Sequence, residues 1–176
     1  MYFTRQMPQD FTKVSLNQII KDAMYFIEPQ CIKENISISF HLADNLPFIF
    51  ADNLQLNQVI VNLVVNAIQA MPERGTLTIT TSYNSQSVFL SVEDTGLGIS
   101  EKIIKHIFNP FFTTKEIGKG TGLGLSVVHG ILSAINGTIN VKSKEGVGTK
   151  FEIEFPMYNE SIELTKIFGS DRKNSQ

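Results

Sequence analysis

Two glycine-rich stretches, each next to an apolar run, contain the residues of this sequence best suited to chemistry. The first is 94–98, Asp-Thr-Gly-Leu-Gly, and the second is 118–125, Gly-Lys-Gly-Thr-Gly-Leu-Gly-Leu. Glycine lets a backbone turn with positive φ or approach a ligand closely. Asp94 follows an alternating run, so its carboxylate should emerge at a strand end. The apolar segment after Gly124 can form a helix, whose first N–H groups attract an anion. The two stretches together predict a nucleotide pocket.

A pair of asparagines, Asn62 and Asn66, lies four residues apart on one face of a strongly apolar helical pattern. Asparagine has poor helix propensity, and its amide is costly to bury without partners. The two amides could cap local backbone or face water. Alternatively, their oxygens face a polar ligand or a hard cation, which prefers oxygen donors. We favour the ligand interpretation.

An aromatic segment broken by proline, residues 108–115, leads into the second glycine stretch. Its aromatic side chains could simply pack in the core. Beside a glycine-rich segment, they are also typical of a mobile lid anchored by aromatic residues. In that interpretation Lys115 or Lys119 would reach the phosphate groups.

The elements that must position these residues follow from hydrophobic periodicity. Helical patterns begin at the capping residues Ser15, Asp52 and Ser100 and after Gly124, and they end near Pro29 and Pro72 for the first two. Strand patterns cover 36–42, 76–81, 87–93, 138–143 and 149–155, of which the last four form two hairpins. Helices thus alternate with hairpins rather than with single strands. We predict an α/β two-layer sandwich, with a mixed, largely antiparallel sheet and helices packed on one face, and we disfavour a doubly wound fold.

Composition excludes several classes of function. The 176 residues fit one domain, and 42% apolar residues suffice for a core. The net charge of −2, with no block of Lys or Arg, argues against nucleic acid or an anionic membrane as a partner. The single cysteine, Cys31, suits a reduced cytosolic setting. No apolar run approaches membrane-spanning length, and no signal-peptide pattern is present.

The ordered set of motifs resembles the ATP-binding catalytic domain of sensor histidine kinases, within the superfamily shared with gyrase, Hsp90 and MutL ATPases. The matching positions are Asn62 and Asn66, 94–98, 108–112, 120–125 and 146–149. The resemblance covers 15–156 and implies the Bergerat-type ATP-binding fold. Within the family, 62–71 and 109–115 look closest to kinases of the nitrogen-regulation type.

The resemblance also implies roles for single residues. Asp94 would accept a hydrogen bond from the adenine amine, with Gly98 and Thr149 completing the adenine contacts, partly through water. Asn66 would bind Mg²⁺, and Asn62 would lie beside the metal and the phosphates. Many relatives carry a basic residue where this chain has Gln69, so Lys115 is our choice for a catalytic cation on the phosphates. The full implied ATP set is Asn62, Asn66, Asp94, Gly96, Gly98, Ile99, Phe112, Lys115, Lys119, Gly120, Thr121, Gly122, Leu123, Gly124, Leu125 and Thr149.

Asn62 also separates subfamilies. The water-activating ATPases of this superfamily carry glutamate there, and an amide cannot act as a general base, so we expect slow hydrolysis to solvent. A kinase can dispense with that base when the acceptor brings its own nucleophile. In histidine kinases the acceptor histidine is usually followed by Glu or Asp, whereas the histidines here are followed by Leu42, Ile107 and Gly130.

We therefore expect a fragment that holds Mg-ATP and donates the γ-phosphoryl group to a histidine on an upstream dimeric helical hairpin. Residues 1–14 would be the remnant of the connection to that hairpin, 15–156 the catalytic domain, and 157–176 a partly disordered tail with a short helix at 161–168. A response-regulator receiver domain would be the indirect partner. The whole protein would be a cytoplasmic homodimer or one anchored to a membrane through upstream segments; this fragment itself would make no membrane contact.

Two alternatives stay open at this level. The chain could be an interaction module that closes on ATP without transferring phosphate. It could also be a serine kinase of the anti-sigma-factor kind, which shares the fold and needs no upstream hairpin. The complete set of metal, adenine and lid positions favours the histidine kinase.

Overall fold

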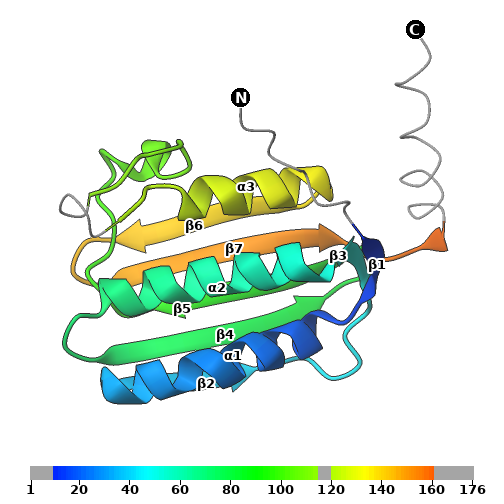
Figure 1. Cartoon of the computed structure of the whole chain (residues 1–176), viewed down its shortest axis with the longest axis horizontal. Coiled ribbons are helices and arrows are strands. Elements are labelled where there is room, and N and C mark those ends of the chain that lie inside the picture. The colour runs from blue at the N-terminus through cyan, green and yellow to red at the C-terminus, as the bar shows by residue number, and fades with distance from the viewer. Residues whose placement is uncertain (1–9, 115–119, 161–176) are drawn as a thin grey trace, which may run out of the picture.

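The computed structural model describes residues 10–114 and 120–160, which form two layers, a sheet and a layer of helices (Figure 1). The helices are α1 (Leu16–Lys33), α2 (Asn53–Ala70) and α3 (Gly124–Ala134), with a 3₁₀ turn, η1, at Ile104–His106. The strands are β1 (Phe11–Val14), β2 (Ile36–His41), β3 (Ile49–Asp52), β4 (Gly75–Tyr83), β5 (Ser87–Asp94), β6 (Thr138–Lys144) and β7 (Gly148–Pro156). None of the helices in these ranges has the length and apolar character needed to cross a membrane.

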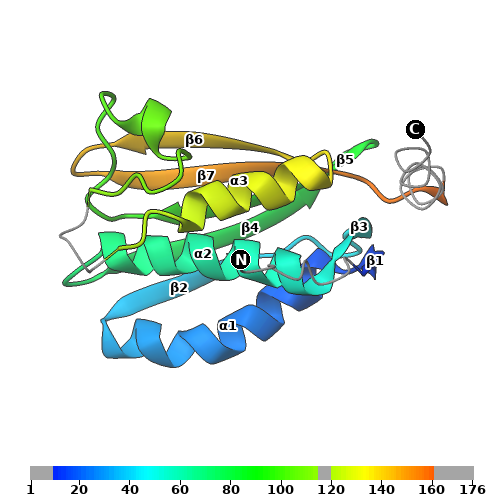
Figure 2. The same ribbon diagram turned by 45° about the horizontal axis from the view of Figure 1, so that its top comes forward.

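The main sheet has the strand order β2-β4-β5-β7-β6. Both expected hairpins form, β4 with β5 and β6 with β7, and β5 pairs antiparallel with β7 between them. Only β2 runs parallel to its neighbour, β4. Figure 2 shows α1, α2 and α3 lying side by side over one face of this sheet. The predicted mixed, largely antiparallel α/β sandwich is thus confirmed.

Helix α2 lies at the centre of the helical layer, and its apolar face is fully enclosed. Leu56, Val59, Ile60, Leu63 and Val64 have no exposed surface, and they pack with the inward residues of the strands in a single core. The helix begins where predicted, because the Asp52 carboxylate accepts a hydrogen bond from the N–H of Gln55 at 3.0 Å. It ends at Ala70, before Pro72.

Helix α1 begins at its predicted cap, with the Ser15 hydroxyl accepting from the N–H of Gln18 at 3.4 Å. The prediction that it stops near Pro29 was wrong, since it continues to Lys33. Proline removes one backbone hydrogen bond from a helix interior, but Pro29 is on the exposed face. The apolar stripe continues past it to Cys31, which is completely buried, and this burial holds the last turn in helical form.

Residues 11–14, which were assigned to a connection, form a strand of the fold: β1 pairs antiparallel with β3, and Val14 is buried. One other expectation was wrong. The helix expected after Ser100 is only a set of turns around η1, in which no side chain caps the N-terminus. Whether 1–14 also connects to an upstream hairpin stays a prediction. Residues 161–168, expected to be helical, lie outside the described ranges.

Candidate functional site

Asp94 and Thr149 lie side by side at one end of the central strands β5 and β7. In the antiparallel register of β5 and β7, these two residues are directly opposite each other. Each is 5% exposed, although both are polar. Buried polar groups need hydrogen-bond partners, so such a pair must be held in place by its surroundings.

The Asp94 carboxylate receives two backbone hydrogen bonds. Its Oδ1 accepts from the N–H of Gly96 at 2.8 Å and from the N–H of Thr149 at 3.3 Å. Burial raises the pKa of this carboxyl above its ordinary value, and the two N–H donors act in the opposite direction. Since both donors use Oδ1, the carboxylate has its second oxygen available for a ligand donor.

The loop after β5 packs tightly against the end of α2. The N–H of Leu97 donates to the carbonyl of Ala70 at 2.9 Å, and a Cβ atom at Gly96 would collide with that same carbonyl oxygen. Glycine is therefore required at position 96 by the close approach of two backbones. The loop holds Asp94 and the C-terminal turn of α2 in one fixed arrangement.

A cavity of about 700 Å³ opens beside this loop. It lies between α2, the loop after β5, residues 112–114 and the start of α3. Twelve of its lining residues belong to the predicted ATP set: Asn62, Asn66, Asp94, Gly98, Ile99, Phe112, Gly120, Thr121, Gly122, Gly124, Leu125 and Thr149. The rest of the lining is Val65, Gln69, Ala70, Leu97, Ile103, Ile107, Thr113, Thr114 and Phe151. The volume is within the range of small-molecule sites.

Most residues of this second group were not identified as site residues from the sequence. They are mainly the apolar walls of the cavity, and in a sequence such residues look like ordinary core. A signal did exist for Val65, because it shares the face of α2 that carries Asn62, Asn66 and Gln69 at helical spacing. Leu97 lies inside the first glycine stretch, and it is 64% exposed despite its apolar side chain.

Four residues of the predicted set are not placed on the cavity wall by the structure. Gly96 acts behind the wall, through its bond to Asp94. Leu123 is the residue before α3, where its N–H donates to the Thr121 hydroxyl at 3.4 Å. Lys115 and Lys119 lie outside the described residues.

Asn62 connects α2 to the start of α3. Its side-chain Nδ2 donates to the carbonyl oxygen of Gly124 at 3.3 Å. This bond uses one of the two N–H donors and fixes the amide, and the amide oxygen of Asn62 has both lone pairs to offer a ligand. Asn66, one turn further along α2, is half-buried on the same cavity wall. Hard cations prefer such oxygen donors.

The described residues contain no group of three His, Cys, Asp or Glu side chains that could hold a metal ion by themselves. A cation at the two asparagines would therefore need most of its oxygen ligands from water and a bound anion. A triphosphate supplies such oxygens, so the donor set fits a metal that arrives with the nucleotide.

The start of α3 is the other polar feature of the cavity. The helix begins at Gly124 without a side-chain cap, so its first N–H groups are available to an anion. The segment before it is anchored by Phe108, whose ring lies 5.7 Å from that of His129 on α3 and 6.5 Å from that of Phe151 on β7. An aromatic anchor for this segment was expected from the sequence.

The three histidines lie away from the carboxylate of the site. His41 is exposed at the end of β2, 3.1 Å from the Ser39 hydroxyl, and His129 is exposed on α3. His106 is exposed in η1, with its ring 6.1 Å from that of Phe112. None of them lines the cavity.

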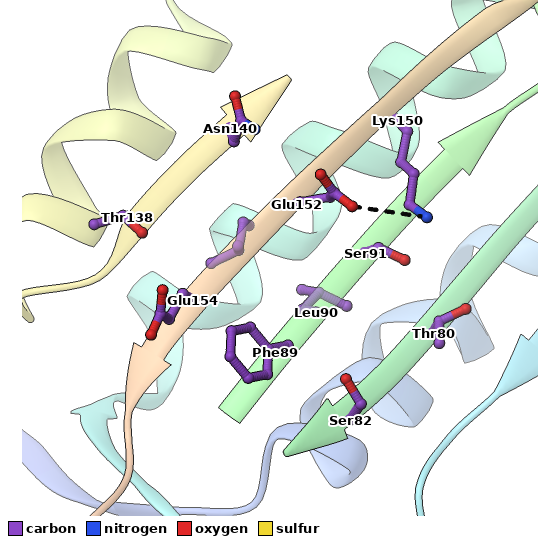
Figure 3. A pocket seen from close by; sticks show the side chains of 11 residues that line it. Thr80, Ser82, Phe89, Leu90, Ser91, Thr138, Asn140, Lys150, Glu152 and Glu154 are labelled. Carbon is purple, nitrogen blue, oxygen red and sulfur yellow. Dashed lines mark ion pairs between the residues drawn. The ribbon is translucent and has the colours of Figure 1, made fainter. Parts of the chain in front are cut away.

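A second hollow, of about 440 Å³, lies on the face of the sheet that the helices leave open (Figure 3). It is lined by side chains of β4, β5, β6 and β7. Lys150 lies 3.8 Å from Glu152, and Glu154 accepts from the Ser87 hydroxyl at 2.6 Å. The helix-side cavity is larger and contains the buried Asp94, which has one carboxylate oxygen left for a ligand, so it is the stronger candidate site.

Several known proteins match most of this chain. Residues 51–159 match the family described as histidine kinase-, DNA gyrase B- and HSP90-like ATPases. The chain is 41% identical over 144 residues to the sensor histidine kinase ZraS of Escherichia coli (strain K12), covering 82% of this chain and 30% of ZraS. It thus spans less than a third of that curated relative.

Solved structures give the same result. The catalytic domain of histidine kinase ThkA is 36% identical, with a TM-score of 0.76, and the match covers 84% of this chain and 96% of that domain. ThkA in complex with the response regulator TrrA matches at 30% identity and a TM-score of 0.71, over 85% of this chain and 42% of that one. Full-length ShkA in complex with AMPPNP matches at 28% identity and a TM-score of 0.77, over 87% of this chain and 32% of that one.

Proposed function

This chain belongs to the family of histidine kinase-, DNA gyrase B- and HSP90-like ATPases, and from this premise we propose that it is the catalytic ATP-binding domain of a two-component sensor histidine kinase. In this proposal it binds Mg-ATP and donates the γ-phosphoryl group to a histidine outside this sequence. The match to the ThkA catalytic domain, which covers 96% of that domain, supports this assignment. The nitrogen-regulation subtype stays a prediction.

The base end of the cavity suits adenine. Asp94 and Thr149 together present oxygen acceptors at the floor of a largely apolar cleft. The exocyclic amine of adenine is a donor, and a buried carboxylate makes a strong hydrogen bond to it. Leu97, Ile99 and Ile107 provide apolar walls for the faces of the purine ring.

The opposite end suits the phosphates. The N–H groups at the start of α3 and the positive end of its dipole would hold phosphate oxygens. Asn66 would bind Mg²⁺, with Asn62 beside it; when bound, the ion neutralises charge on the transferred phosphoryl group. Lys115, outside the described residues, is the proposed cation on the γ-phosphate.

The acceptor must lie elsewhere. Asn62 stands where a water-activating glutamate would be needed, and its amide cannot take a proton from water. The histidines of this chain do not line the cavity, and none is followed by Asp or Glu. An acceptor histidine on an upstream dimeric hairpin supplies its own nucleophile, so positioning of the phosphates is sufficient for transfer.

The remaining assignments are proposals by analogy. ThkA was solved with a response regulator, which supports a receiver domain as the final phosphoryl acceptor here. Homodimerisation would come from the upstream hairpin. The cytosolic setting rests on the single buried cysteine, Cys31.

The observation that carries the proposal is the buried Asp94–Thr149 pair at the floor of a cavity whose other end combines two asparagines with a helix start. The test is to incubate this chain with γ-labelled ATP and a histidine-bearing helical hairpin from a related sensor kinase. Label that appears on the hairpin and is lost in acid supports the proposal, because phosphohistidine is acid-labile. Acid-stable label, or binding of ATP without transfer to the hairpin of any relative tested, would contradict it.

A further inference from the structure

We propose that Ser143, which does not line the cavity, selects the base of the nucleotide by fixing the direction of the Thr149 hydroxyl proton. The inference rests on the proposed function, since it concerns how the same site distinguishes purines. Ser143 on β6 lies directly opposite Thr149 on β7, which lies directly opposite Asp94 on β5. The three residues thus form one row across neighbouring strands.

The Ser143 hydroxyl makes three contacts at hydrogen-bond distance. Its Oγ lies 2.8 Å from the N–H of Ile99, 2.9 Å from the carbonyl oxygen of Gly148 and 2.8 Å from Oγ1 of Thr149. A hydroxyl has one proton to donate and two lone pairs. The N–H of Ile99 can only donate and the carbonyl can only accept, so Ser143 must donate its proton to Gly148.

It follows that the third contact is donated by Thr149. With the Ser143 proton already used, the 2.8 Å contact between the two hydroxyls is a hydrogen bond only if the Thr149 proton points to Ser143. The lone pairs of Thr149 are then what this residue offers to a ligand. Thr149 lines the cavity, so it acts there as an acceptor.

The second acceptor beside it is Asp94. Its Oδ1 is occupied by two backbone N–H groups, and an ionised carboxylate has no proton to donate. The base end therefore presents two acceptors and no side-chain donor from this row. At its 6-position a 6-aminopurine offers N–H groups to these acceptors, whereas a 6-oxopurine offers a carbonyl oxygen, which would face like partners. Sites built in this way reject the mismatched analogue strongly.

Removing the Ser143 hydroxyl should release the Thr149 proton. In Ser143→Ala the Thr149 hydroxyl can rotate and donate to a 6-oxo group, so discrimination between ATP and ITP should fall by about tenfold, the worth of one hydrogen bond. If Ser143 had a purely structural role, its loss would weaken the binding of both nucleotides by the same factor. The ratio of the ATP and ITP affinities therefore shows whether Ser143 selects the base or only stabilises the site.

The experiment is calorimetric titration of ATP and of ITP, each with Mg²⁺, into the wild-type chain and its variants. Ser143→Thr restores a hydroxyl and should restore the wild-type ratio. Ser87→Ala is the matched control, because Ser87 is a bonded hydroxyl at the far end of β5 and lies outside the cavity. It should leave the ratio unchanged.

The possible results are distinct. A lower ATP preference in Ser143→Ala alone supports the inference. An unchanged ratio of the two affinities, with or without an equal loss of affinity for both nucleotides, overturns the inference but leaves the proposed ATP site standing. If Ser143→Ala does not fold, Thr149→Val takes its place, and a wild-type ratio in that variant overturns the inference. If the wild-type chain binds neither nucleotide, the proposed function fails and the inference fails with it.

Discussion

The two ends of the cavity are built in different ways. At the base end, Asp94 and Thr149 are buried and held by strand pairing and by a 3.3 Å hydrogen bond between them. Further contacts of 2.8 Å join Gly96 to Asp94, Ile99 to Ser143, and Ser143 to Thr149. At the phosphate end, the side-chain bonds that join the described segments are long, 3.3 Å from Asn62 to Gly124 and 3.4 Å from Leu123 to Thr121. Phe111 in this region has a positive φ and is 75% exposed.

This difference separates two tasks. The sheet holds the groups that recognise the base in one geometry before the ligand arrives. Binding of the base therefore requires little loss of conformational entropy from the protein. The phosphate end is made of loop and helix-start backbone, whose contacts can adjust to the ligand and to the transferred phosphoryl group. Changes at the base end should therefore affect folding as well as binding, and changes at the phosphate end should affect binding more than folding.

Gly148→Ala should give the largest effect, because Gly148 has a φ of +140° and a Cβ there would collide with the carbonyl oxygen of Asp94. We expect a loss of about 3 kcal/mol or more in the free energy of unfolding, measured in urea. Gly146→Ala is the control: its φ is +74° but its Cβ would meet open space, so only about 1 kcal/mol should be lost. Equal losses would show that the base end is not rigid.

Asp94→Asn should separate binding from stability. The amide cannot replace the charge-assisted bond to the base amine, so ATP affinity should fall about a hundredfold. Because burial raises the pKa of Asp94, the ionised form is the less stable one in the folded chain. The variant should therefore unfold at a higher urea concentration at pH 7. This advantage should disappear as the pH falls through the raised pKa, where the wild-type carboxyl also becomes neutral.

Gly122→Ala tests the phosphate end. Gly122 has a φ of +67°, and a Cβ there would collide with the backbone of Phe111. ATP affinity should fall by about tenfold, and the free energy of unfolding should fall by about 1–2 kcal/mol, less than in Gly148→Ala, because the strain lies in a loop outside the core. The control is Gly130→Ala in α3, whose Cβ would meet nothing within 4 Å; it should stabilise the chain slightly and leave affinity unchanged. If Gly122→Ala lost as much free energy of unfolding as Gly148→Ala, the two ends of the cavity would not differ in rigidity.

Lys142→Ala should give the smallest effect. Lys142 lies 2.6 Å from Glu152 on the open face of the sheet, and this contact lowers the pKa of Glu152. Both side chains are partly exposed, and such pairs contribute less than about 0.5 kcal/mol. Neither the free energy of unfolding nor ATP affinity should change measurably. An effect on affinity would mean that the open face takes part in the site.

Much of this arrangement could be predicted from the sequence, because periodicity and caps are local signals. Ser15, Asp52 and the two hairpins are examples. Strand β1 was not predictable, since four residues form a strand only when β3 is present to pair with them. The continuation of α1 past Pro29 depends on the burial of Cys31, which is a tertiary effect.

The site likewise contains residues that could be predicted from the sequence and residues that could not. The polar members, such as Asp94 and Asn62, could be identified because their residue types are unusual in apolar surroundings. The apolar walls and Ser143 could not, because a serine in a strand is ordinary. The hairpin turn at 145–147 sets the strand register that places Ser143 opposite Thr149, so this pairing could have been predicted from the sequence. The direction of the Thr149 hydroxyl proton could not, because it depends on the positions of Ile99 and Gly148.

The most direct test of the account is calorimetric titration of the wild-type chain with a non-hydrolysable ATP analogue, with and without Mg²⁺, with Asp94→Asn as the comparison. We predict that the wild-type chain binds, that Mg²⁺ tightens the binding, and that the variant shows little binding in either condition. If the wild-type chain does not bind, or if Asp94→Asn binds equally well, the helix-side cavity is not an ATP site of the proposed kind.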